Sequence, residues 1–166
     1  MPSQIDTFAL KRAKDGILRA LRTIDRADGY NTSPKAQIGA VQMDKVPAGE
    51  LPFLAVEFGD MALDAQLFGG ASFGILRIGW PAFVWGYVGS SGNADDLYEA
   101  GLALLADVLA AIYAAETLPD GAGQDTVIAV EPGTITFDME QFAAENRGYF
   151  LAEFTLIVDL IRGANP

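Results

Sequence analysis

The sequence predicts an α+β fold, a mostly antiparallel or mixed β-sheet with two main α-helices packed on it, formed by a single domain over residues 1–166. Two observations lead to this prediction. Long helical patterns stand near the start and in the middle of the chain, and short runs with strand chemistry follow each of them. The order of helix, strands, helix and strands is typical of helices packed on an antiparallel sheet, and the length is that of one domain.

The first helix is expected from about Ser3 to Asp25. Ser3 can cap its start, and Asp28 with Gly29 marks its end. Its apolar positions follow the spacing of an amphipathic stripe; they are Ile5, Phe8, Ala9, Ala13, Ile17, Ala20, Leu21 and Ile24. The opposite face is basic and carries Lys11, Lys14, Arg19, Arg22 and Arg26. Such a face is typical of a solvated helix, and the alternative is a surface that docks on an acidic partner.

Strands are expected after this helix at residues 36–42 and 53–58, and again at 75–78 and 82–88, where the last two are joined by a break at residues 79–81. The Gly-rich segment 59–74 fits either a loop or a hairpin tip. The strand over 82–88 has an aromatic face that is more typical of a core than of a ligand site, formed by Phe83, Trp85 and Tyr87.

The second helix is expected from about residue 94 to residue 117, with Asn93 or Asp95 as its cap. Acidic residues in its first turn suit the helix dipole. Apolar side chains cover most of its circumference, among them Leu97, Tyr98, Leu102, Leu104, Leu105, Val108, Leu109, Ile112 and Tyr113. A stripe of this width predicts packing against the sheet and a possible contact with a second subunit.

The last strands are expected at residues 126–130, 134–137 and 149–162. One face of the final strand is entirely apolar and is predicted to be core; it consists of Phe150, Ala152, Phe154, Leu156, Val158 and Leu160. The other face mixes polar and apolar residues, as in a partly hydrated interface.

The composition excludes most catalytic chemistry. The chain has no Cys and no His, which excludes Ser-His-Asp triads, Cys-His dyads, zinc fingers and an imidazole base. We therefore predict no enzyme activity, no catalytic residue, no metal and no cofactor. The first 20 residues lack the apolar core of a signal peptide, no apolar run is long enough to span a membrane, and we expect the protein to be made in a cytoplasm.

Four weak motifs remain. Residues 69–75 have glycines at P-loop spacing, but Ile75 stands where the phosphate-binding Lys belongs, so nucleotide binding is not predicted. The turn 89–92 and the cluster at Asp95, Asp96 and Glu99 are better explained by the start of a helix than by an anion or cation site. Four carboxylates lie close enough in sequence to suggest a glycosidase-like pair, Asp138, Glu140, Glu145 and Glu153, although an acidic chain produces such neighbours by chance.

Charge is uneven along the chain. Residues 1–35 hold seven Lys and Arg against four Asp and Glu, whereas residues 36–166 hold four against 18, and the total is −11. An acidic body repels nucleic acid, so sequence-specific DNA binding is not predicted.

Four features of the first part of the chain occur in a fixed order: residues 17–24 (ILRALRTI), residues 29–32 (GYNT), a short strand that reaches Val41, and residues 51–56 (LPFLAV). In these features the chain resembles the tail terminator, or tail completion, proteins of long-tailed bacteriophages. The later part agrees in the order of its elements: a strand pair, an Ala/Leu-rich helix from Asp95, and a long closing strand. The match covers most of the chain, and its specificity lies in the order and spacing of segments that are individually weak.

The resemblance implies a homohexameric ring that caps the tail tube, ends tube polymerisation and provides the surface for head or neck joining. It implies a virion protein of the tail or neck that is assembled in the host cytoplasm, with itself, the tail tube protein and a head-completion or neck protein as partners, and with DNA only passing through the lumen. Another phage neck or tail adaptor, or a carboxylate-dependent enzyme, remains the alternative.

The resemblance carries over no binding motif, so we infer the interfaces from charge and position. Contacts with a neighbouring subunit or the tube are expected at the basic helix face and at the Gly-rich segment, through Lys11, Lys14, Arg19, Arg22, Gly69, Gly70 and Phe73. An acidic lumen that keeps passing DNA from sticking is expected from Asp138, Glu140, Glu145 and Glu153.

Overall fold

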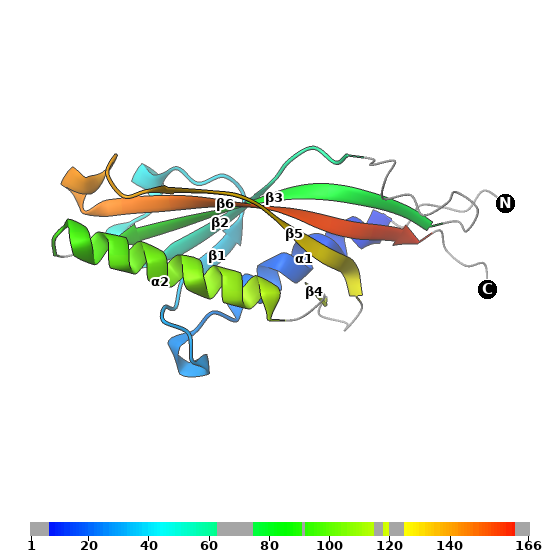
Figure 1. The fold of residues 1–166 in the computed structure, drawn as a ribbon, viewed down its shortest axis with the longest axis horizontal. Helices are drawn as coiled ribbons and strands as arrows, with labels where there is room; N and C mark the ends of the chain where they lie inside the picture. The colour runs from blue at the N-terminus through cyan, green and yellow to red at the C-terminus, as the bar shows by residue number, and fades with distance from the viewer. Residues whose placement is uncertain (1–6, 63–74, 91, 115–117, 120–124, 162–166) are drawn as a thin grey trace.

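The computed structural model describes residues 7–62, 75–90, 92–114, 118–119 and 125–161 (Figure 1). They form one six-stranded sheet in the order β1-β2-β3-β6-β5-β4. β1 is parallel to β2 and every other neighbouring pair is antiparallel, so the predicted α+β fold with a mixed sheet is confirmed. The elements are α1 (Thr7–Arg22), β1 (Lys35–Ile38), β2 (Phe53–Phe58), β3 (Ile75–Gly89), α2 (Ala94–Tyr113), β4 (Leu118–Pro119), β5 (Asp125–Asp138) and β6 (Arg147–Ile161), with short 3-10 turns at Arg26–Asp28, Met43–Lys45, Ala48–Glu50 and Ala143–Glu145.

Both helices lie on the same side of the sheet, α2 along one half and α1 along the other (Figure 1). Alternate residues of the strands point toward them, and the fully buried side chains include Leu54 of β2, Val84 of β3 and Phe150 of β6. The predicted core face of the last strand is confirmed from Phe150 to Val158, and Leu160 lies among the side chains outside the description.

The central strand β3 corrects the prediction of two strands with a break at residues 79–81. β3 pairs with β6 without interruption from Ile75 to Gly89. Pro81 is tolerated because it lies just beyond the end of β2, where its carbonyl accepts the Gly59 N–H at 2.9 Å. Pro81 has no N–H to donate across to β2. The indole N–H of Trp80 supplies a donor there and bonds to the Gly59 carbonyl at 3.0 Å.

β5 is likewise one strand rather than the two predicted at 126–130 and 134–137. Its register with β6 shifts between Val127 and Ala129 and between Pro132 and Ile135. Such β-bulges absorb residues that cannot continue a regular ladder, and Pro132 with Gly133 are residues of that kind.

Several element ends also differ from the prediction. α1 ends at Arg22 because Asp25 instead caps the following 3-10 turn, accepting the Ala27 N–H. β1 starts at Lys35 and stops at Ile38, where Gly39 adopts a φ of 111°. α2 is capped by Asn93, one of the two predicted caps, within a capping box completed by Asp96, and ends at Tyr113; residues 115–117 lie outside the description.

Candidate functional site

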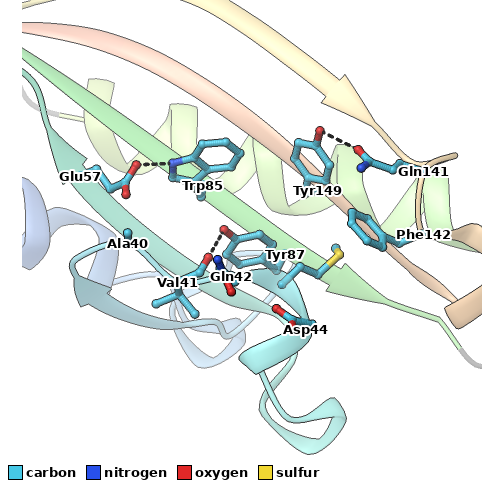
Figure 2. A pocket seen from close by; sticks show the side chains of 11 residues that line it. Ala40, Val41, Gln42, Asp44, Glu57, Trp85, Tyr87, Gln141, Phe142 and Tyr149 are labelled. Carbon is cyan, nitrogen blue, oxygen red and sulfur yellow. Dashed lines mark hydrogen bonds between the residues drawn. The ribbon is translucent and has the colours of Figure 1, made fainter.

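The helix-free face of the sheet carries an aromatic cleft of about 590 Å³ (Figure 2). Its floor is formed by Trp85 and Tyr87 of β3 and Tyr149 of β6, which share this face because they are alternate or directly paired residues. The chain between β1 and β2 and the turn between β5 and β6 supply the walls, namely Ala40, Val41, Gln42, Met43, Asp44, Gln141 and Phe142. Glu57 of β2 completes the lining.

Hydrogen bonds hold the aromatic side chains of this cleft. The Trp85 indole N–H donates to Glu57 Oε2 at 2.9 Å, and the Tyr87 hydroxyl donates to the Val41 carbonyl. Burial, followed by the charge of Glu57, raises the pKa of Tyr87 to about 12. The Tyr149 hydroxyl lies 3.3 Å from Gln141 Oε1, and burial followed by the charge of Asp138 raises the Tyr149 pKa. The aromatic face predicted from 82–88 is therefore part core and part cleft.

Two of the predicted lumen carboxylates, Asp138 and Glu153, lie on this same face. Asp138 pairs with Tyr149, and Glu153 lies four residues further along β6, paired with Phe83 of β3. Glu140 and Glu145 instead lie in the turn between β5 and β6, where both are exposed. The structure thus brings Asp138 and Glu140 to one end of the sheet and leaves Glu153 near its middle.

Asp138 has a local structural task. Its Oδ1 accepts the N–H groups of Glu140 and Gln141 at 3.0 Å each, and these bonds lower the Asp138 pKa. A carboxyl group held ionised in this way cannot serve as a general acid near neutral pH. Within the described residues, no group of three or more His, Cys, Asp or Glu side chains is placed to hold a metal ion.

The predicted basic residues of α1 differ in their exposure. Lys11, Arg19 and Arg22 are exposed, whereas Lys14 is half-buried. Lys11 pairs with Asp15 at 2.7 Å, and Arg22 Nε donates to the Ala36 carbonyl of β1 at 3.4 Å. The other predicted contact residues, Gly69, Gly70 and Phe73, lie outside the described residues.

Sequence reasoning missed Asp107, which is 2% exposed in α2. Its carboxylate accepts the backbone N–H groups of Asn31 and Thr32, and also the Asn31 amide and the Thr32 hydroxyl, at 2.6 to 3.0 Å. Asp107 stands next to the apolar residues of α2 in the sequence. A charged residue beside an otherwise apolar helix face is the sequence feature that could have indicated a buried, hydrogen-bonded carboxylate. No helix in the described part of the chain is long and apolar enough to cross a membrane.

No protein-family model matches the chain, and no curated protein matches it. Among solved structures, the fold is similar to the sheath/tube terminator of an extracellular contractile injection system, called PVC, in its extended state. The similarity has a TM-score of 0.50 at 14% sequence identity and covers 100% of this chain and 62% of that chain. This protein therefore spans less than two thirds of the length of the terminator, and at this identity the likeness is one of fold.

Proposed function

We propose that the protein is a structural, non-enzymatic subunit that caps a phage-type tail tube. In this role it forms a ring on the last ring of the tube, ends tube polymerisation and offers the surface for the next component of the particle. The carrying observation is the fold similarity to a sheath/tube terminator along the whole chain. The absence of His and Cys from the sequence supports a role without chemistry.

The proposal extends to the kind of particle and the arrangement of the ring. We assign the protein to the tail or neck of a long-tailed phage particle, assembled in the host cytoplasm as a homohexamer, with the tube protein and a head-completion or neck protein as partners. We place the helix-free face, with Asp138 and Glu153, toward the lumen, and Glu140 and Glu145 at its rim. Negative charge there would keep passing DNA from binding.

The proposal is tested by native mass and by binding to tubes. Light scattering and negative-stain images of the purified protein are expected to show rings of about six subunits, or a monomer that forms rings when mixed with tubes of the tube protein encoded in the same genome. Co-sedimentation is expected with tubes, at their ends, and added protein is expected to shorten growing tubes. A protein that stays monomeric and neither binds the tubes nor limits their length would contradict the proposed function.

A further inference from the structure

An exposed apolar surface follows the border between α2 and β5. We call it the α2–β5 stripe; its exposed members are Tyr98, Leu102, Tyr113 and Ile135, and the half-buried Leu105 and Leu109, which pack against the core, lie between them on α2. The helical members recur every three or four positions, so they share one side of α2. Leu102 is 56% exposed, Tyr113 45% and Ile135 44%. Ile135 pairs with Ala152, a core residue, and so extends the stripe on the helix side of the sheet.

The elements that carry the stripe come from a strongly acidic part of the sequence. From residue 94 to residue 146 the sequence has 11 Asp and Glu and no Lys or Arg, which equals the net charge of the whole chain. Asp95 and Glu99 border the stripe on α2, one turn from Leu102 or Tyr98. Glu140 lies 3.4 Å from the Tyr98 hydroxyl. An apolar strip with a carboxylate rim suits a partner that is apolar at its centre and basic around it.

The opposite edge of the same sheet carries an exposed apolar residue beside basic ones. β1 is the outermost strand there, and the C-terminal end of α1 packs against it, with Arg22 bonded to the Ala36 carbonyl. Arg19 is exposed one turn earlier, and Ile38 of β1 is 36% exposed. The C-terminal end of α1 thus brings Arg19 and Arg22 to β1, while other parts of this helix pack on β4, β5 and β6; the 20 residues of α2 have four Asp and Glu and no basic residue.

We propose that the α2–β5 stripe is the binding surface for a second copy of this chain, which docks through its α1–β1 edge, defined by Arg19, Arg22 and Ile38. The two surfaces lie on opposite edges of one sheet, so the contact is head-to-tail and can close into a ring. The inference rests on the proposed function and gives the ring its subunit interface.

The edge strands themselves are poorly suited to joining the subunits by sheet extension. The Ala36 carbonyl of the edge strand β1 accepts the Arg22 Nε–H, and the part of β5 that extends beyond its short pairing with the edge strand β4 carries Pro132 at a bulge. Both features are known devices against strand addition. Side-chain contacts on the helix side are therefore the basis of the inferred interface.

Two double variants test the two surfaces. Leu102→Glu with Ile135→Glu places charge in the α2–β5 stripe, and Arg19→Glu with Ile38→Glu reverses the α1–β1 edge. Met61→Glu is the matched control, because Met61 is 45% exposed and belongs to neither surface. We expect both double variants to sediment as monomers, with self-association weakened at least roughly ten-fold, which corresponds to about 1.4 kcal/mol. The control is expected to assemble as the wild type does. Circular dichroism melting checks that each variant is folded.

Mixing the two double variants tests the head-to-tail geometry. Each variant retains one intact surface, so the mixture is expected to form heterodimers that cannot grow further. A mixture that stays monomeric, or double variants that assemble like the wild type, would overturn the inferred interface. If the wild type assembles only on tubes, the same series is measured there by co-sedimentation and imaging.

The outcomes separate the interface from the proposed function. If the wild type forms rings or caps tubes and the variants do so equally well, the inferred interface is wrong and the proposed capping role is unaffected. A stripe variant that keeps its ring but no longer binds tubes would show that the tube, rather than a second copy, covers the stripe. A wild type that assembles neither alone nor on tubes overturns both.

Discussion

At the scale of single residues, Asp107 links α2 to the segment between α1 and β1. A buried carboxylate without hydrogen bonds would be costly, and this one accepts bonds from four donors on Asn31 and Thr32. Because those donors come from a segment about 75 positions away in the sequence, the bonds fix the end of α1 and the start of β1 against the middle of α2.

We expect Asp107→Ala to lower the free energy of unfolding by about 3 kcal/mol, because it leaves several buried donors without an acceptor. Asp107→Asn is expected to lower it by a similar or slightly smaller amount, since an amide NH₂ would face other N–H groups. Urea unfolding followed by circular dichroism gives the value. The control is Glu99→Gln, an exposed carboxylate on the same helix; equal effects of Glu99→Gln and Asp107→Asn would refute the structural role.

Tyr87 provides a prediction at alkaline pH. Its folded pKa is raised to about 12, mainly by burial, above an unfolded value of about 10. The folded state therefore favours the neutral Tyr87 side chain. The stability that depends on a neutral Tyr87 is fully present below about pH 10 and is lost as the pH rises through the folded pKa. We expect stability to fall over this window in the wild type and to fall less in Tyr87→Phe.

The measurement is the stability of both proteins between about pH 9 and 12, with a tyrosinate absorbance titration of each. Tyr87→Phe also removes the bond to the Val41 carbonyl and is expected to cost about 1 kcal/mol at neutral pH. The raised pKa does not belong to Tyr87 if the variant and the wild type lose the same stability between these pH values. The same holds if the tyrosine that ionises at the highest pH in the wild type is still seen in the variant.

At the scale of elements, β3 and β6 pack through a close approach that only glycine allows. A Cβ added to Gly86 would lie 2.2 Å from Cε1 of Phe150, its directly paired residue, which is fully buried. The Phe150 ring lies over the Gly86 backbone and cannot move away without opening the core, because protein interiors are close-packed.

Gly86→Ala is therefore expected to destabilise the protein by about 1–3 kcal/mol through overpacking. Gly49→Ala is the matched control, because nothing lies within 4 Å of a Cβ there and its φ is not positive; it is expected to be neutral or slightly stabilising. Thermal unfolding of the two variants compares them directly. Equal melting temperatures would mean that Phe150 can be displaced at little cost.

The elements also show what the sequence could predict. The bounds of β2, the core face of β6 and the choice of Asn93 as one of two candidate caps of α2 follow from local patterns, and the structure confirms them. The continuity of β3 through Pro81 does not, because it depends on where β2 ends and on an indole donor from Trp80. The aromatic cleft and the buried Asp107 depend on contacts between distant segments, which no local pattern reveals.

At the scale of the whole molecule, the acid-rimmed α2–β5 stripe and the basic C-terminal end of α1 lie toward opposite edges of the sheet. The acidic part over residues 94–146 contains α2 and β5, and the basic end of α1 lies at β1. Oppositely charged ends favour head-to-tail contacts and speed encounter, while an equal division over the surface would do neither. A ring whose subunits attract one another by charge should therefore depend on salt differently from a ring held together by apolar contacts alone.

Salt dependence follows from that division and is the last prediction. If basic α1–β1 edges meet acid-rimmed stripes, added salt screens their attraction, and we expect self-association to weaken roughly ten-fold between about 0.05 and 0.5 M NaCl, as the Debye length shortens. A purely apolar contact would be unchanged or strengthened by salt, and the net charge of −11 would also favour assembly at high salt by screening repulsion between subunits. Sedimentation equilibrium over this range decides between them. The Glu99→Gln variant, which removes one rim charge, is expected to show a shallower dependence, and association that strengthens with salt in both proteins would leave the charge pairing without a role.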